Sequence, residues 1–259
     1  MLRYYTRSTH FPSTISFMSN NTPTTDFEKA WQGKLSAGLD QYLESDQHSQ
    51  ILDGGEQLTM ESPTLEKIIW SCEMLDKLDK ATDERSQQEI LSGCACQYPK
   101  ENLEEARGIY LETGDVDQVI DHLQVKFIGF LNEVLELEDP LIQEITSRGW
   151  GLAGVRDGTR IISTKIPKSG YLVDYFKTED PQEKRKLYCH CPRVRDGVGD
   201  EPQLPEVYCY CGAGFYKGIW ETILDEPLRV EVLESVMVGG DVCKIAIHLP
   251  ETVTIQTNP

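Results

Sequence analysis

Six of the eight cysteines stand in Cys-x-Cys doublets, the pattern in this chain best suited to chemistry. The doublets are Cys94/Cys96, Cys189/Cys191 and Cys209/Cys211, and Cys243 follows them. In an extended strand, residues i and i+2 point to the same face, so each doublet is expected to present two sulfurs side by side. Paired sulfurs suit metal binding or thiol chemistry better than ordinary core filling.

A metal site is the first interpretation of the C-terminal doublets. We predict that Cys189, Cys191, Cys209 and Cys211 converge at one site, with Cys243 close by. Zinc is the expected ion, with haem or an iron–sulfur cluster as alternatives. Seventeen residues separate the two doublets, within the usual range between zinc half-sites. An extended Cys-x-Cys, however, holds its Cα atoms about 6.5–7 Å apart, whereas two zinc-bound sulfurs lie under about 4 Å apart.

Thiol catalysis is the second interpretation. One sulfur, with Cys191 and Cys211 as the catalytic candidates, would act as the nucleophile while the others tune it. Basic residues near the first C-terminal doublet would favour the thiolate: Arg185, Lys186, Arg193 and Arg195. His190 becomes a metal ligand only if a strand is broken there. The pair Cys94/Cys96 either joins the C-terminal group or forms a separate redox pair.

The segment Lys165-Ile-Pro-Lys168-Ser-Gly170 is a candidate anion site. Two lysines flank a proline and precede a Ser-Gly turn whose N–H groups are able to hold a carboxylate or phosphate. Together with Arg193 and Arg195, Lys165 and Lys168 form the predicted substrate-binding set. An exposed turn at a strand end is the alternative interpretation.

Residues 26–149 are predicted to be helical throughout. Ser62-Pro63 supplies a helix start, and an apolar stripe of Leu65, Ile68, Ile69, Cys72 and Leu75 predicts that Cys72 is a buried core thiol. Further helices are expected up to Gly93, from Pro99 to Thr113, over 115–137 and from Asp139 to Gly149. His122 flanks the stripe of the 115–137 helix and is expected to be hydrogen-bonded or solvated.

Residues 150–250 are predicted to form an α+β region. Strands are expected over 160–166, 228–237 and 242–249, the last two joined by a hairpin at Gly239-Gly240. Helices are expected to begin at Asp180-Pro181 and to span 212–224. The predicted fold class is α+β, with a helical N-terminal half packed as one unit on a C-terminal half that holds an antiparallel sheet and one or two helices. Residues 251–259 are expected to form a tail.

The composition narrows the class of protein. The formal net charge of −18 argues against a nucleic-acid partner or an anionic membrane surface. No apolar run is long enough to span a bilayer or to form a signal-peptide core, which favours the cytoplasm. In a reducing compartment, clustered cysteines indicate metal ligands or catalytic thiols before disulfides. Residues 1–25, rich in Ser and Thr, are expected to be a dispensable, disordered leader. A transit peptide, or a true start at Met18, is the alternative.

Several C-terminal motifs occur in a familiar order. They are Cys191-Pro192, the Cys209/Cys211 doublet before a helix, Gly240-Asp241 and Cys243. In this order they resemble the family named after L-2-amino-thiazoline-4-carboxylic acid hydrolase. Residues 230–245 are also similar to the close of 4-vinyl reductase type small-molecule-binding domains. Trp150-Gly-Leu-Ala-Gly and the Cys-His-Cys-Pro-Arg-Val-Arg run resemble a cysteine-rich bacterial branch of the hydrolase family.

The resemblance implies ring-opening of a small cyclic amidine carboxylate at a C–N or C–S bond. The doubled cysteines, and Ile245 where an aromatic residue is usual, depart from the family pattern, so the substrate is not carried over. Two hypotheses follow. The first is a cytoplasmic hydrolase of a small carboxylate-bearing molecule, with a thiolate or zinc-thiolate site lined by Cys191, Cys209, Cys211 and Cys243. The second is a non-catalytic module that binds a metal, haem or small molecule.

Overall fold

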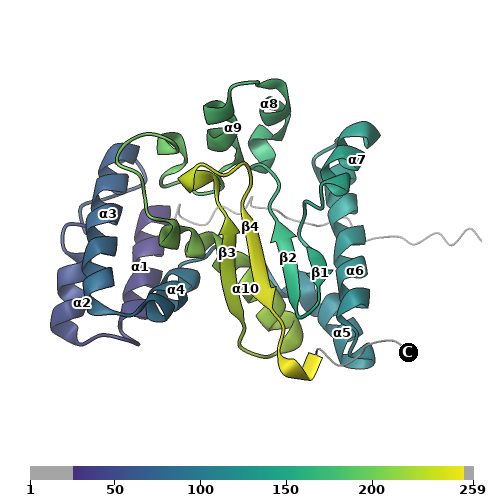
Figure 1. Ribbon diagram of the computed structural model, residues 1–259, viewed down its shortest axis with the longest axis horizontal. Coiled ribbons are helices and arrows are strands. Elements are labelled where there is room, and N and C mark those ends of the chain that lie inside the picture. Colours follow the sequence, from purple (N-terminus) through teal and green to yellow (C-terminus); the bar gives the residue numbers. More distant parts are fainter. Residues whose placement is uncertain (1–25, 254–259) are drawn as a thin grey trace, which may run out of the picture.

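The computed structural model describes residues 26–253 (Figure 1). The predicted leader, 1–25, and residues 254–259 of the predicted tail lie outside the described residues. Within the described part, the helices precede and flank a four-stranded sheet, so the predicted α+β class is confirmed. No helix in that part is long and apolar enough to cross a membrane.

The region before residue 150 is helical, as expected. Its α-helices are α1 (Phe27–Leu39), α2 (Ser45–Leu52), α3 (Thr64–Ala81), α4 (Glu84–Gly93), α5 (Glu104–Thr113), α6 (Val116–Gly129) and α7 (Asp139–Ser147). The predicted 115–137 helix is α6 continued by a π-helical turn, Phe130–Val134. Gly114 ends α5 with a φ of 65°, a left-handed conformation that glycine adopts without strain.

The region after residue 150 supplies the sheet and three more α-helices among the described residues. The strands are β1 (Val155–Asp157), β2 (Arg160–Thr164), β3 (Arg229–Glu234) and β4 (Lys244–His248); the helices are α8 (Leu172–Lys177), α9 (Pro181–Tyr188) and α10 (Tyr210–Leu224). The strand order is β1-β2-β4-β3, and every neighbouring pair is antiparallel. The predicted β3–β4 connection turns at Gly239, where φ is 93°.

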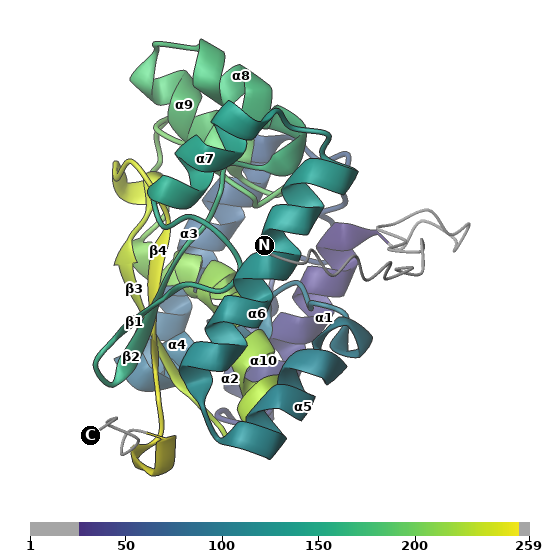
Figure 2. The same ribbon diagram turned by 90° about the vertical axis from the view of Figure 1, so that its right-hand side faces the viewer.

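Helix α10 packs both on the sheet and on the N-terminal helices. It lies against one face of the sheet and packs on α4 and α5, with α1 farther from the sheet (Figures 1 and 2). The strand register places Ile161, Ile247 and Val230 in one row, and all three are buried on this side. Because side chains alternate along a strand, the next row points to the opposite face, which no helix covers in Figure 1. That row is polar: Arg160, His248 and Arg229.

The buried face of α3 differs from the predicted stripe. Leu65 and Ile69 are exposed, at 53% and 42%, and Cys72 is only half-buried. The helix instead buries a row that passes through Ser71, whose hydroxyl accepts a hydrogen bond from the Arg193 guanidinium. The prediction followed the apolar residues alone, and it missed the true buried face because that face includes the polar Ser71. The prediction that Cys72 is a buried core thiol is therefore corrected.

Candidate functional site

Neither C-terminal doublet lies on a strand, which corrects the basis of the predicted side-by-side sulfurs. Cys189 caps the end of α9, and its N–H donates to the Arg185 carbonyl. Cys209 ends a 3-10 turn, Glu206–Cys209, and Cys211 lies in the first turn of α10. Helix α10 begins at Tyr210, before the predicted Gly212, because the turn that follows Pro205 continues directly into it.

The fold nevertheless brings the five predicted sulfurs into one neighbourhood. Burial raises the pKa of Cys189, and the thiols of Cys191, Cys243 and Cys209 raise it further through their negative charge when ionised. The same interactions join Cys209 to Cys243 and Cys191, and Cys211 to Cys191. The end of α9, the start of α10 and the residue before β4 therefore meet at a group of thiols, called the thiol site below: Cys189, Cys191, Cys209, Cys211 and Cys243.

Three of these sulfurs have a defined polar neighbour. The contacts are Cys191 Sγ with the Tyr208 hydroxyl at 3.5 Å, Cys209 Sγ with Ser235 Oγ at 2.9 Å, and the Trp31 indole N–H with Cys211 Sγ at 3.4 Å. Neither Trp31 nor Tyr208 was singled out from the sequence. Trp31 lies in α1, far from the doublets in sequence, and no local pattern points to it.

Burial keeps most of the thiol site protonated. It raises the pKa of Cys211 to about 12, with Cys191 as the next cause, while Trp31 and Lys165 oppose the rise. The pKa values of Cys209 and Cys243 are also raised, again with burial as the largest cause. These thiols are neutral at pH 7, and they can donate protons to a bound molecule.

Lys165 brings the positive charge of the site. Its backbone N–H donates to the Cys243 carbonyl at 3.0 Å, and its own carbonyl accepts from the Tyr188 hydroxyl. A Cβ atom at Gly212 would lie 3.2 Å from the ammonium nitrogen, which therefore sits beside the first turn of α10. The ammonium lowers the pKa values of Cys209, Cys211 and Cys243 in part. Among residues 26–253 no carboxylate forms an ion pair with it.

The other predicted substrate-binding residues make other contacts. Arg193 is fully buried and its guanidinium contacts Glu28, Ser71 and Tyr208, so it is closed to a dissolved ligand. Arg195 stacks on the Tyr171 ring at 4.3 Å and pairs with Asp196. Lys168 precedes the short 3-10 turn Ser169–Tyr171 and contributes positive charge near His190. Of the predicted set, Lys165 and Arg193 lie beside the sulfurs, and Arg193 is already engaged in a fully buried ion pair with Glu28.

His190 and His122, the two histidines considered from the sequence, have defined surroundings in the structure. His190 Nε2 lies 2.8 Å from the Ile166 carbonyl, and burial, followed by the charge of Lys165, lowers its pKa to about 3. It is a neutral donor to that carbonyl. His122 lies in α6 with its Nε2 3.6 Å from a Glu105 oxygen, but within the described residues that nitrogen is buried without a hydrogen-bond partner, so the expected hydrogen-bonded or solvated histidine is corrected at this atom.

The pair Cys94/Cys96 lies near Cys211 of the thiol site. Cys94 is buried, and its pKa is raised by burial first and by the charge of Cys211 next. Cys96 is exposed, and its charge contributes to the raised pKa of Cys211. The contact follows from Gly214 of α10, where an added Cβ would collide with the Ser92 carbonyl of α4. The chain that carries the first doublet is thus held directly against the helix that carries Cys211.

A preformed metal centre is absent from the described part of the chain. Within residues 26–253, no three or more His, Cys, Asp or Glu side chains are arranged to hold a metal ion. Zinc, haem and an iron–sulfur cluster remain predictions, with five sulfurs of suitable chemistry as their possible ligands.

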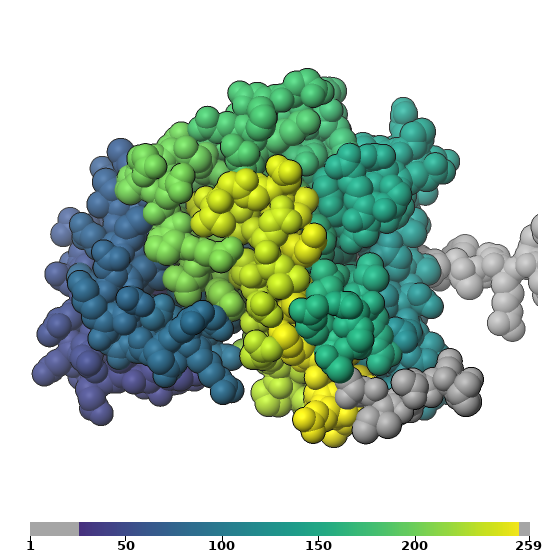
Figure 3. All heavy atoms as spheres, viewed as in Figure 1, coloured from purple at the N-terminus to yellow at the C-terminus, as the bar shows by residue number. Residues whose placement is uncertain are grey.

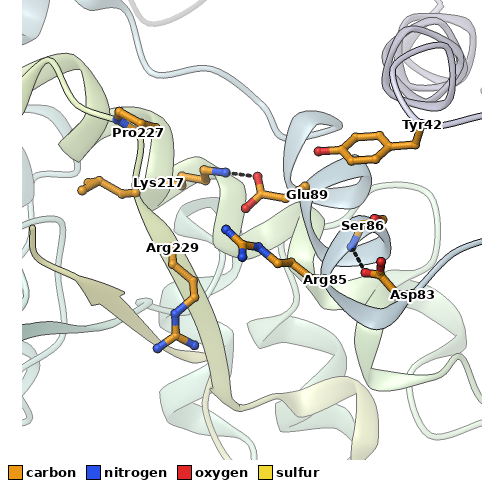
Figure 4. A pocket seen from close by; sticks show the side chains of 9 residues that line it. Tyr42, Asp83, Arg85, Ser86, Glu89, Lys217, Pro227 and Arg229 are labelled. Carbon is orange, nitrogen blue, oxygen red and sulfur yellow. Dashed lines mark hydrogen bonds and ion pairs between the residues drawn. The ribbon is translucent and has the colours of Figure 1, made fainter.

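A surface pocket of about 580 Å³ lies away from the thiols, between α4 and the start of β3 (Figure 4). In Figure 3 a gap opens between the blue surface of α4 and the yellow-green surface next to β3. Its acidic groups are engaged: Asp83 accepts from the Ser86 N–H, and Glu89 pairs with Lys217. No cysteine lines this pocket.

No family model matches the chain, and no match was found among curated proteins or solved structures. The fold and the site together define an α+β protein with a buried, lysine-bearing thiol site. The resemblance to the hydrolase family rests on the sequence motifs alone.

Proposed function

We propose that the protein is a thiol-dependent hydrolase that cleaves a C–N or C–S bond in a small carboxylate-bearing molecule of the cyclic amidine class. The observation that carries this proposal is the position of Lys165. Its ammonium lies among the sulfurs and has no carboxylate partner in the described residues. The expected catalytic thiols are Cys191 and Cys211, the two candidates named from the sequence.

A ligand carboxylate would neutralise the positive charge of the Lys165 ammonium in this site. An ammonium that is partly buried without an opposite charge is costly, and an anion that enters beside it removes that cost. Cys209, Cys211 and Cys243 are deep enough for burial to dominate their pKa values, yet each keeps some accessible surface. Three thiols that are largely buried but still partly accessible suit a small molecule better than a polymer.

The reaction would proceed through a covalent intermediate. A thiolate adds to the amidine carbon, which forms an S–C bond and moves the C=N electron pair onto nitrogen; the nitrogen takes a proton from a neighbouring thiol. The C=N bond re-forms as the ring C–N or C–S bond breaks, and that proton passes to the leaving heteroatom. Water then displaces the sulfur: its OH binds carbon, its other proton returns to the thiol, and the attacking sulfur leaves as thiolate. One water is consumed.

Lys165→Gln tests the carboxylate contact, with Lys168→Gln as the matched control from the same segment. A hydrogen bond to a charged group contributes about 1.5–3 kcal/mol, so we expect KM for five-membered cyclic amidine carboxylates to rise roughly 10–150-fold in Lys165→Gln. The control should keep the KM of the wild type. Equal effects of the two substitutions, or no turnover by the wild type across a panel of such compounds, would contradict the proposal.

The proposed setting is a reducing compartment, the cytoplasm, with a small molecule and not a nucleic acid as partner. All eight cysteines are free, and reduced thiols are required for the reaction. The net charge of −18 disfavours nucleic acid.

A zinc-thiolate site, catalytic or part of a sensor module, is the second candidate. The convergence of five thiols favours it, because thiolates at one site repel each other unless a cation or protons neutralise them. Ligation would require the sulfurs to leave their present hydrogen-bond partners.

A further inference from the structure

A fully buried ion pair adjoins the thiol site. The guanidinium of Arg193 donates two hydrogen bonds to Glu28, at 2.6 and 2.8 Å, and both side chains have no exposed surface. The Trp31 ring lies against the guanidinium, with 3.9 Å from its central carbon to the ring centroid. Burying such a pair costs free energy that its attraction only partly repays, so its place beside the sulfurs calls for an explanation.

The chemistry of the groups fixes the direction of the hydrogen bonds. A guanidinium has donors and no acceptor, so the Tyr208 oxygen accepts from Arg193 Nη1 at 2.7 Å. The single proton of that hydroxyl is then left to point at its other neighbour, Cys191 Sγ, at 3.5 Å. The Cys191–Tyr208 distance by itself allows either atom to be the donor, and the Arg193 contact favours Tyr208 as the donor and sulfur as the acceptor. A donor aimed at sulfur stabilises the thiolate over the thiol.

Cys211 receives a different contact from the same group of residues. Its donor is the indole N–H of Trp31, at 3.4 Å, and the Trp31 ring is the one that stacks on Arg193. Burial nevertheless raises the pKa of Cys211 to about 12. The two catalytic candidates thus have different donors. Cys191 contacts the Tyr208 hydroxyl, which the buried Arg193 cation polarises, whereas Cys211 accepts from the uncharged indole of Trp31.

We propose that Cys191 is the nucleophile, that Tyr208 is the catalytic residue that donates to its thiolate, and that Arg193 and Glu28 are positioning residues that impose the direction of the Tyr208 proton. The catalytic part of this inference rests on the proposed function. The direction of the Tyr208–Cys191 hydrogen bond does not depend on it.

Alkylation of the reduced, full-length protein tests the inference without a substrate. The rate of carbamidomethylation by iodoacetamide is measured at each cysteine by peptide mass spectrometry between pH 6 and 10. In the wild type we expect Cys191 to react before Cys211. In Tyr208→Phe the alkylation of Cys191 near neutral pH should slow about tenfold, because the thiolate loses its hydrogen-bond donor, while its rate at high pH stays unchanged.

Tyr216→Phe is the matched control. It also deletes a buried tyrosine hydroxyl, one that donates to the Gly151 carbonyl at 3.2 Å and not to sulfur, so the Cys191 profile should stay as in the wild type. An unchanged Cys191 profile in Tyr208→Phe, or faster alkylation of Cys211 than of Cys191 in the wild type, overturns the inference. The second comparison needs no variant, so the inference stays testable if Tyr208→Phe does not fold.

The outcomes separate this inference from the proposed function. A wild type that hydrolyses none of the amidine panel, but whose Cys191 profile depends on Tyr208, overturns the hydrolase and supports the polarised hydrogen bond. If the wild type hydrolyses the amidines but the Cys191 alkylation profile is the same in Tyr208→Phe, the inference is overturned and the proposed function stands.

Discussion

At the residue scale, the His190 ring lies near Lys165 and Lys168, and its Nε2 contacts the Ile166 carbonyl at 2.8 Å. Burial is the largest cause of its low pKa, about 3 against an ordinary 6.5. The folded state therefore binds the proton less readily than the unfolded chain. The stability that depends on a neutral ring is complete above about pH 6.5 and is lost as the pH falls toward 3.

We expect His190→Gln to flatten this acid dependence. Glutamine keeps an N–H donor for the Ile166 carbonyl and does not titrate, so its free energy of unfolding should fall less than that of the wild type between pH 7 and pH 4. Urea unfolding at several pH values measures both slopes. Identical slopes would mean that the ring is hydrated in the folded state.

At the scale of the elements, the contact between α10 and α4 depends on Gly214. A Cβ there would collide with the Ser92 carbonyl, which belongs to the backbone and has little room to move. We expect Gly214→Ala to lower the free energy of unfolding by about 1–3 kcal/mol, or roughly 2–4 °C in melting temperature per kcal/mol. It should also make Cys96 and Cys211 more reactive toward iodoacetamide, because the two helices separate.

Gly108→Ala is the control for that substitution. Gly108 lies within α5, and nothing stands within 4 Å of an added Cβ. Alanine is the better helix former, so this variant should gain up to about 1 kcal/mol. Equal melting temperatures for the two variants would show that α10 accommodates a side chain at 214.

Periodicity and cap residues were enough to predict most elements, because those signals are local. Asp115 caps α6 and Asp180 caps α9, where each was expected. The doublets were misplaced on strands because Cys-x-Cys carries no information about backbone conformation. Cys209 and Cys211 instead follow the turn begun by Pro205. His248 and Glu231 are far apart in sequence, yet they lie 3.2 Å apart across neighbouring strands.

At the scale of the whole molecule, a metal bound at the thiol site would contribute to the stability of the fold. We expect the melting temperature of the full-length protein to be insensitive to a strong chelator, because three of the sulfurs already have hydrogen-bond partners. Elemental analysis of untagged protein gives the metal content directly. A fall of several degrees, with release of bound zinc, would favour the second candidate, since metal binding energy at such a site is folding energy.

The cysteines themselves were visible in the sequence, and their partners were not. Lys165 was predicted as a ligand contact, whereas Trp31, Glu28 and Tyr208 carried no motif. Arg193 was predicted to bind substrate, because a sequence does not tell a buried arginine from an exposed one. Its partner lies in α1, at the start of the described chain.

That separation also bears on the order of folding. Glu28 and Arg193 are 165 residues apart, so their contact closes a very long loop. The chain loses the conformational entropy of that loop before the contact can stabilise it, which makes the contact slow to form. Tyr208 and the sulfurs cannot take up their final geometry until α1 has docked. During synthesis and refolding the thiols are therefore open to oxidation, and the yield of correctly folded protein should depend on reductant even though the finished molecule contains no disulfide.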